Sequence, residues 1–292
     1  MSLALLPASG NLAVGDAGAT LSIDGSLVNS SILILSPNTR VVRFIDDGAK
    51  YVQSLAVLPT GQLVSGDKWW LIKIWDMPSR KLIRTINSNA GTVNCLAVLN
   101  SGLLASGHLN GWDVLVWNTT TGQQQLALTG HQGWVNALAV LPNGDLASAS
   151  ADRTIRIWDV VSGQTKSILT GHTDRVQSLA LLPNGNLVSG ASGFQSDKSI
   201  RIWDLTTGQI VQTLTDHRAS TYYFAIYALL ALPNGLVASA GSDQTVRIWD
   251  PSTGDILQTL VGHNDSVNAL ALLPDGKIAS GSDDTTVRFW SQ

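Results

Sequence analysis

The stretch GHQGWVNALAVLPNGDLASASADRTIRIWD, residues 130 to 159, contains three short segments of strand length, VNALAVL, DLASA and TIRIW. Such segments are typical of β-strands because they are rich in apolar and β-branched residues and are bounded by turn residues. The tripeptide Pro142-Asn143-Gly144 marks a tight turn between the first two segments. A fourth segment, QTKSIL at 164 to 169, follows the next loop. The stretch therefore predicts a small sheet of four antiparallel strands.

The same pattern returns along the chain with a period of about 40 residues, as in proteins built from stacked supersecondary units. A tryptophan closes the third segment at positions 75, 117, 158, 203, 249 and 290. One period before Trp75 lies Leu35, in a segment (SILILSPNTRVVRFI) that aligns with SIRIWDLTTGQIVQTL at 199 to 214. We therefore count seven copies, at approximately 1–45, 46–86, 87–128, 129–169, 170–214, 215–260 and 261–292.

A lone four-stranded unit as apolar as these copies cannot hide both of its faces from water. The copies must pack face to face, and closing the array into a ring leaves no bare end. We predict an all-β fold, a seven-bladed β-propeller of four-stranded antiparallel blades, in one domain that spans residues 1–292. The last copy stops at Gln292, just past its third strand. We expect the last blade to lack its outermost strand within this chain, and a flanking chain is a candidate to supply that strand.

The recurring GH, PNG, SASxD and IWD elements resemble those of the WD-repeat propellers, and the resemblance covers essentially the whole chain. In that family the GH histidine, a second-strand serine, a turn aspartate and the tryptophan form a hydrogen-bonded tetrad in each blade. The resemblance implies four tetrads here: His131, Ser148, Asp152 and Trp158; His172, Ser189, Asp197 and Trp203; His217, Ser239, Asp243 and Trp249; His263, Ser280, Asp284 and Trp290. A His, Ser and Asp together would also suit a hydrolase. A nucleophile is needed only once, however, so we interpret the repeated set as a structural network.

The first three copies depart from this pattern. The histidine position holds Gly48 in copy two and Asn89 in copy three, and the aspartate position holds Trp69 and Gly111. Copy one has Leu35 in place of the tryptophan. We expect these copies to lack the tetrad, to be held more by apolar packing, and to form the softer side of the ring.

Composition and charge narrow the classes of function. The 292 residues include 18 basic and 21 acidic ones, a net charge of −3, which argues against nucleic acid or a membrane as a partner. We find neither a signal peptide nor an apolar run of about 18 residues, and expect a cytoplasmic or otherwise intracellular protein. The single cysteine, Cys95, is interpreted as a packed thiol and His108 as a loop residue. The sequence has no unrepeated catalytic set and no metal-ligand spacing, so we expect no enzyme activity, metal or cofactor.

Ten aromatic residues are not explained by the repeat. Within their copies they lie in the loop before the first strand, in the first residues of that strand, or in the loop between the second and third strands. Because alternate loops of an antiparallel sheet share a face, these loops lie on one side of the ring, which we call the top face. The predicted binding residues there are Tyr51, Trp69, Trp70, Trp112, Trp134, Phe194, Tyr222, Tyr223 and Phe224, with Arg175 and Arg218 at the polar rim. One of Trp69 and Trp70 is also a candidate to fill the gap left by the missing tetrad of copy two.

A contiguous aromatic patch with a polar rim is typical of an interaction site. We interpret the chain as a non-enzymatic scaffold that docks a protein or peptide segment on the top face, a role that the family resemblance also implies. The alternative is a small-ligand or glycan binder that uses the same tryptophan and tyrosine face, since flat rings beside Asp, Asn and Gln also suit sugar rings.

Overall fold

The computed structural model describes residues 1–6, 10–15, 21–23, 26–28, 32–35, 42–45, 51–193, 197–215 and 224–291. All regular elements in these ranges are β-strands. Four sheets have four strands each. They are β1 (Ser2–Leu6), β2 (Asn11–Gly15), β5 (Ile32–Leu35) and β6 (Val42–Ile45); β7 (Val52–Val57), β8 (Leu63–Asp67), β9 (Leu71–Asp76) and β10 (Lys81–Asn87); β11 (Val93–Val98), β12 (Leu104–His108), β13 (Val114–Trp117) and β14 (Gln124–Leu128); and β15 (Val135–Val140), β16 (Leu146–Ser150), β17 (Ile155–Trp158) and β18 (Thr165–Leu169).

The remaining strands form a larger sheet, a three-stranded sheet and a hairpin. The eight-stranded sheet contains β19 (Arg175–Leu181), β20 (Leu187–Gly193), β21 (Ile200–Asp204), β22 (Gln209–Leu214), β23 (Phe224–Ala231), β24 (Val237–Gly241), β25 (Thr245–Trp249) and β26 (Ile256–Val261). The three-stranded sheet contains β27 (Val267–Leu272), β28 (Ile278–Ser282) and β29 (Val287–Trp290), and the hairpin pairs β3 (Leu21–Ile23) with β4 (Ser26–Val28).

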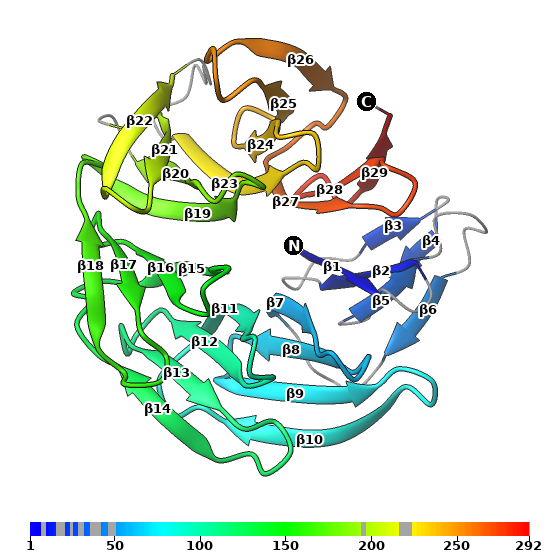
Figure 1. Ribbon diagram of the computed structural model, residues 1–292. Helices are drawn as coiled ribbons and strands as arrows, with labels where there is room; N and C mark the ends of the chain where they lie inside the picture. The colour runs from blue at the N-terminus through cyan, green and yellow to red at the C-terminus, as the bar shows by residue number, and fades with distance from the viewer. Residues whose placement is uncertain are drawn as a thin grey trace.

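The sheets are arranged as blades around a centre (Figure 1). Each four-stranded sheet is antiparallel and runs outward in chain order, so its first strand is innermost. The innermost strands are β1, β7, β11, β15, β19, β23 and β27. The first of them, β1, contacts both β7 and β27, which closes the ring. The predicted all-β propeller of antiparallel four-stranded blades is therefore confirmed.

Local sequence explains the turns between the strands. In copy four the Gly144 amide donates to the Leu141 carbonyl, and the Leu141 amide donates to the Asp145 carbonyl, which closes the turn between β15 and β16. Gly144 has a φ of 89°, a conformation that costs glycine little because it has no Cβ. In the turn between β17 and β18, the Asp159 carboxylate accepts hydrogen bonds from the amides of Val161 and Ser162. Aspartate favours such turns because its side chain bonds to the nearby backbone.

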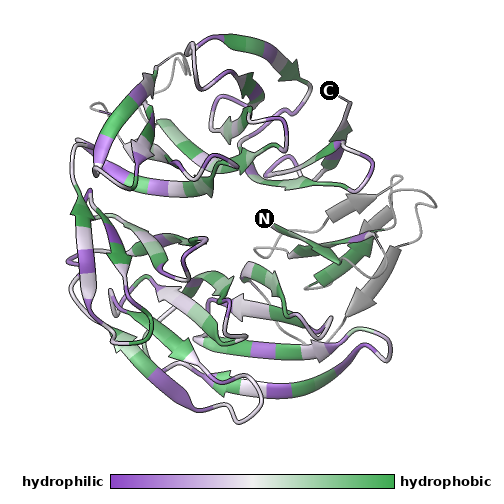
Figure 2. Ribbon diagram, viewed as in Figure 1, coloured by the Kyte–Doolittle hydropathy of each residue, from purple (hydrophilic) through white to green (hydrophobic). Residues whose placement is uncertain are grey.

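The apolar core lies between neighbouring blades. One cluster joins Val64, Ile72 and Ile74 of copy two to Leu104 and Trp117 of copy three. The largest fully buried side chains include the third-strand tryptophans Trp75, Trp158, Trp203 and Trp249. Figure 2 colours most strands of the described blades as hydrophobic, whereas the outermost strands β10, β18 and β22 alternate between hydrophobic and hydrophilic residues. The blades are thus held face to face by apolar packing, and their outermost strands meet water on one side.

The last sheet has three strands among the described residues. Its third strand, β29, has no outer neighbour in that sheet, and Phe289 on this strand is 42% exposed. Trp290 is half-buried, whereas Trp158 in copy four is fully buried. An outermost strand supplied by a flanking chain stays a prediction.

Candidate functional site

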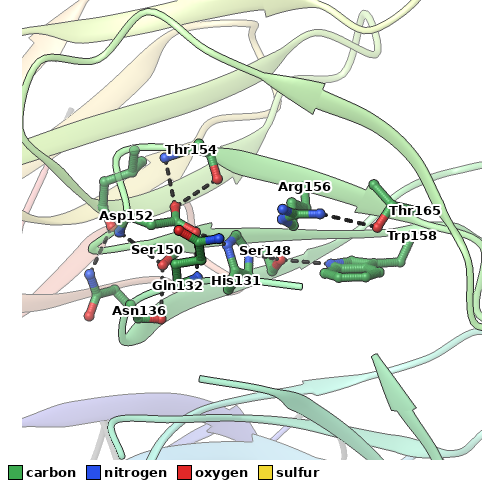
Figure 3. Close-up of polar contacts among 12 residues, drawn as sticks. His131, Gln132, Asn136, Ser148, Ser150, Asp152, Thr154, Arg156, Trp158 and Thr165 are labelled. Carbon is green, nitrogen blue, oxygen red and sulfur yellow. Dashed lines mark hydrogen bonds and ion pairs between the residues drawn. The ribbon is translucent and has the colours of Figure 1, made fainter. Parts of the chain in front are cut away.

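The His, Ser, Asp and Trp side chains of copy four lie in one hydrogen-bonded chain (Figure 3). The Trp158 indole N–H donates to Ser148 Oγ at 2.7 Å, and Ser148 Oγ lies 2.7 Å from His131 Nε2. On the other side of the imidazole, His131 Nδ1 lies 2.7 Å from a carboxylate oxygen of Asp152. Because the carboxylate can only accept, Nδ1 carries the proton, and Nε2 accepts from the serine.

The carboxylate of Asp152 also organises the turn around it. It accepts from the Gln132 amide at 3.0 Å and from the amide and hydroxyl of Thr154 at 2.9 and 2.7 Å. Burial alone would raise the pKa of Asp152, but the hydrogen bonds from His131, Thr154 and Gln132 outweigh it and hold that pKa well below its usual range. The aspartate is therefore ionised, and it ties the loop before β15 to the turn between β16 and β17.

Copies five and seven repeat this geometry. His172 bridges Asp197 and Ser189 at 2.8 and 2.7 Å, and Trp203 donates to Ser189 at 2.8 Å. In copy seven the contacts of His263 with Asp284 and Ser280, and of Trp290 with Ser280, are all 2.7 Å. In copy six Trp249 donates to Ser239 at 2.7 Å and Arg247 pairs with Asp243 at 3.1 Å, while His217 lies outside the described residues.

These serines are placed for structure rather than for attack on a substrate. Ser148, Ser189 and Ser280 are all fully buried, and each already accepts the indole N–H of its tryptophan. A nucleophile must reach the substrate, so this burial argues against a hydrolase triad. The arrangement stabilises each blade as a satisfied buried polar network.

In copy two another carboxylate takes over part of the turn's hydrogen bonding. Trp75 still donates to Ser65 at 3.0 Å, but Trp69 occupies the aspartate position. The carboxylate of Asp67, two residues earlier, accepts from the amides of Trp69 and Leu71 at 2.8 and 2.9 Å. In copy four the equivalent amides of Asp152 and Thr154 donate to Ser150 Oγ and to the Asp152 carboxylate, respectively. Asp67 is only 2% exposed, so the turn keeps a buried aspartate cap although the sequence position differs.

Copy three relocates the histidine, which corrects our interpretation of His108 as a loop residue. His108 is the last residue of strand β12 and is fully buried. Its Nε2 lies 2.9 Å from Ser106 Oγ, and Ser106 Oγ accepts the indole N–H of Trp117 at 2.8 Å. Its Nδ1 lies 3.3 Å from the Gly91 carbonyl, to which it must donate. No complete tetrad forms among the described residues of copies two and three, but each copy keeps part of the hydrogen bonding through residues at other positions, Asp67 in copy two and His108 in copy three.

The predicted top-face tryptophans are exposed. Trp69 and Trp70 lie in the turn between β8 and β9, Trp112 in the turn between β12 and β13, and Trp134 directly before β15. Their exposed fractions are 63%, 45%, 45% and 43%. Neither Trp69 nor Trp70 is buried, because Asp67 rather than a ring supports the turn of copy two. Both rings are available to a partner.

A series of contacts connects these tryptophans across copies two to five. The Lys68 amide donates to the Tyr51 carbonyl, and the Lys68 ammonium lies 5.2 Å from the Tyr51 ring centroid. The Lys68 carbonyl accepts from the hydroxyl of Thr92 in the next copy. The Leu109 amide then donates to the Thr92 carbonyl, which places the Trp112 turn beside the same loop.

The series continues towards copy five. Asn94 in β11 donates from its side-chain amide to the Val135 carbonyl at 3.0 Å, and Val135 directly follows Trp134 in copy four. The Arg175 guanidinium lies 4.9 Å from the Trp134 ring centroid, within range of a cation–π interaction. We call the set Tyr51, Trp69, Trp70, Trp112, Trp134 and Arg175 the aromatic arc.

Two of the tryptophans have an unusual backbone conformation. The φ angles of Trp70 and Trp112 are 70° and 59°. Arg153 and Gln244 occupy the corresponding turn position in copies four and six with φ angles of 71° and 68°. The turn itself therefore requires a left-handed residue, which costs a residue with a Cβ roughly 1–2 kcal/mol. The conformation thus belongs to the turn and not to the tryptophans, and a large exposed ring at this position adds nothing to the core.

Phe224 does not belong to the arc, and this part of the prediction is wrong. It is fully buried as the first residue of β23. The strand starts earlier than the repeat predicts, because Phe224 and Ala225 pair with Gly193 and Ser192 of β20. This pairing joins the sheets of copies five and six and carries the ring into the core. The predicted binding residues Phe194, Tyr222, Tyr223 and Arg218 lie outside the described residues.

Other kinds of site receive no support from the described part of the chain. No group of three or more His, Cys, Asp or Glu residues within the described ranges could hold a metal ion. Burial raises the pKa of the Cys95 thiol to about 12, so the thiol stays protonated and unreactive near neutral pH. Among the residues that the structure describes, no helix is long and apolar enough to cross a membrane.

A ring of antiparallel blades with recurrent His–Ser–Asp–Trp networks defines a β-propeller of the WD-repeat class. The family profile described as "WD domain, G-beta repeat" matches residues 122–159, 163–204, 208–250 and 254–291, more than half of the chain. The chain therefore belongs to the WD40 family. These four matches correspond to copies four to seven, in which the motif is intact, and miss the first three copies, where the histidine, aspartate or tryptophan differs.

A solved structure supports the fold over the full length. The crystal structure of the WD40 beta propeller domain of Doa1 has a TM-score of 0.83 with this chain at 23% sequence identity, covering 100% of this chain and 92% of that one. At this identity the likeness bears on the fold alone. No curated protein matches the chain.

Proposed function

We propose that this chain is a non-enzymatic scaffold that docks a protein or peptide segment on the aromatic arc. The observation that carries the proposal is the exposure of four tryptophans, 43% to 63% each, in top-face loops of three consecutive copies. Large aromatic residues are enriched among the side chains that dominate binding between proteins. WD40 propellers are in general protein-interaction scaffolds, which agrees with this role. As part of the same proposal the ring has seven blades, with the eight-stranded sheet contributing two.

The character of the arc favours a protein partner over a sugar. The Arg175 guanidinium already covers one face of Trp134, and Lys68 lies over Tyr51. Arginine and aromatic residues together are characteristic of protein interfaces. Glycan binding is the second candidate, favoured by the open rings of Trp69 and Trp70. A glycan array separates the two: retention of defined sugars that is lost on Trp69→Ala would establish the second candidate instead.

The test compares two triple variants in affinity capture from the source cell. The first replaces Trp69, Trp112 and Trp134 with alanine. The matched control replaces three exposed apolar residues on the outer strands, Leu82, Val211 and Leu257, which are 44%, 53% and 57% exposed. A partner captured by the native chain and the control but lost in the tryptophan variant supports the proposal, once the purified partner binds directly. The same partners on all three proteins would refute the arc as the docking surface.

A further inference from the structure

The centre of the ring holds a cavity that is distinct from the aromatic arc. It has a volume of about 250 Å³ and is lined by residues of the innermost strands β1, β7, β11, β15, β19, β23 and β27. None of the side chains that line it is charged. Pockets for complete small-molecule ligands are typically about 300 to 1,000 Å³. This cavity is smaller, so its size suits one inserted side chain better than a whole cofactor or sugar chain.

The upper layer of the cavity consists mainly of amide side chains, Gln53, Asn94, Asn136, Gln177 and Asn268. Several of them are held in place by hydrogen bonds. Asn94 Nδ2 donates to the Val135 carbonyl of the next copy at 3.0 Å, and Asn136 Nδ2 donates to the Val176 carbonyl at 2.9 Å. Asn94 Nδ2 also lies 3.5 Å from Asn136 Oδ1, so the capacity left for an entering segment is the Asn94 Oδ1 acceptor and the second N–H of Asn136. The layer is therefore pre-organised and still able to bond with the backbone of an entering segment.

The deeper layer is apolar. Each of the innermost strands supplies one leucine two residues after its upper-layer position, from Leu3 in β1 and Leu55 in β7 to Leu270 in β27. All of these leucines are only half-buried, although they lie at the centre of the molecule. Apolar surface left in contact with water favours burial against an apolar group. A charged side chain in the same place would lose its hydration, and no lining side chain carries an opposite charge to offset that loss.

We infer that the central cavity is a specificity pocket that takes one uncharged apolar side chain of the docked segment, while the amide layer bonds with that segment's backbone. This inference rests on the proposed function, because the segment is the one that the aromatic arc docks. The strand-one loops that carry Tyr51 and Trp134 lead directly into strands β7 and β15, which line the cavity. A segment lying on the arc therefore reaches the mouth of the cavity.

The test uses a displayed library of random dodecapeptides panned against the native chain. Selected peptides are then synthesised and titrated against Leu138→Asn, which makes the leucine layer polar without adding volume. Two controls accompany it: Leu138→Met, which keeps the layer apolar, and Leu257→Asn, which makes the same change on an exposed outer strand. We expect the selected peptides to share one uncharged apolar position. Leu138→Asn should weaken their binding by about tenfold or more, the effect of losing an important contact, and neither control should.

The tryptophan triple variant separates this inference from the proposed function. Peptides that bind Leu138→Asn normally but fail on the tryptophan variant would overturn the pocket and leave the aromatic arc. Peptides lost on Leu138→Asn but retained by the tryptophan variant would support the pocket and overturn the arc. The absence of any selective peptide would overturn both.

A second measurement needs no variant and guards against a loss of folding. The native chain with isotope-labelled leucine methyl groups is titrated with N-acetyl-leucinamide and, separately, with N-acetyl-lysinamide. Saturable shifts of the cavity leucines with the first compound alone support the pocket. Equal shifts with both compounds, or none with either, would contradict it.

Discussion

Replacement of His108 by alanine tests whether this residue takes the structural place of the histidine that the repeat position of copy three lacks. The side chain makes two hydrogen bonds, to Ser106 at 2.9 Å and to the Gly91 carbonyl at 3.3 Å, and it is fully buried. Each lost bond is worth about 1 kcal/mol, and a buried group left without a partner costs about 1–3 kcal/mol. The cavity left by the ring adds to this. We therefore expect the free energy of unfolding to fall by about 2–5 kcal/mol, a large part of the stability of an ordinary domain.

The matched control is Asn89→Gly. Asn89 occupies the sequence position of the repeat histidine, but its side chain is exposed and its φ is 53°, which glycine adopts freely. We expect a change of less than about 0.5 kcal/mol for this variant, as for most surface substitutions. Urea unfolding followed by tryptophan fluorescence measures both, and the midpoints are comparable if the slopes agree. Equal midpoints for His108→Ala and Asn89→Gly would refute the relocation of the histidine.

Three further predictions follow from burial. Phe224→Ala should lower the free energy of unfolding by about 3–5 kcal/mol because the ring is fully buried, whereas Trp134→Ala removes an exposed ring and should change it by less than about 1 kcal/mol. Similar losses of stability for the two variants in calorimetry would contradict the placement of Phe224 in the core. Burial lowers the pKa of His108 and His263, so the unfolded chain takes up protons near pH 6.5 that the folded chain does not, and stability should fall as pH drops from about 7 to about 5. A urea midpoint that is constant over that range would refute this. Burial raises the pKa of Cys95 to about 12, so a thiol reagent at pH ~8 should label the denatured chain and leave the native chain nearly unlabelled.

The pH prediction has a definite sign because the two histidines are held neutral. A group with a lowered basic pKa stabilises the fold above the pKa of the unfolded chain and loses that contribution as pH falls towards the folded value. The tetrad carboxylates Asp152, Asp197 and Asp284 also have lowered pKa values, but those act in a more acidic window. The loss above about pH 5 therefore comes from the histidines, and His108→Phe should reduce it.

The repeat and the strands could be predicted from the sequence because each depends on residues at a regular spacing, and the tetrads of copies four, five and seven followed from the family resemblance. Alternating apolar residues, turn glycines and a recurrent tryptophan are local signals, and their period dictates stacked sheets. The exposed positions of Trp69, Trp112 and Trp134 also followed from the loops that carry them. The repeat, the strands and the loop positions of these tryptophans do not depend on contacts between residues that are far apart in the sequence.

Only the tertiary structure determined which residue completes a network when the usual one is absent. A hydrogen bond depends on where a side chain's polar atom arrives, and Asp67 and His108 reach the required atoms from neighbouring positions in the chain. The burial of Phe224 likewise depends on the pairing of β23 with β20, which links two loops of different copies. The ring of half-buried leucines exists only once β1 meets β27, because closure of the ring brings one leucine from each innermost strand around a common centre.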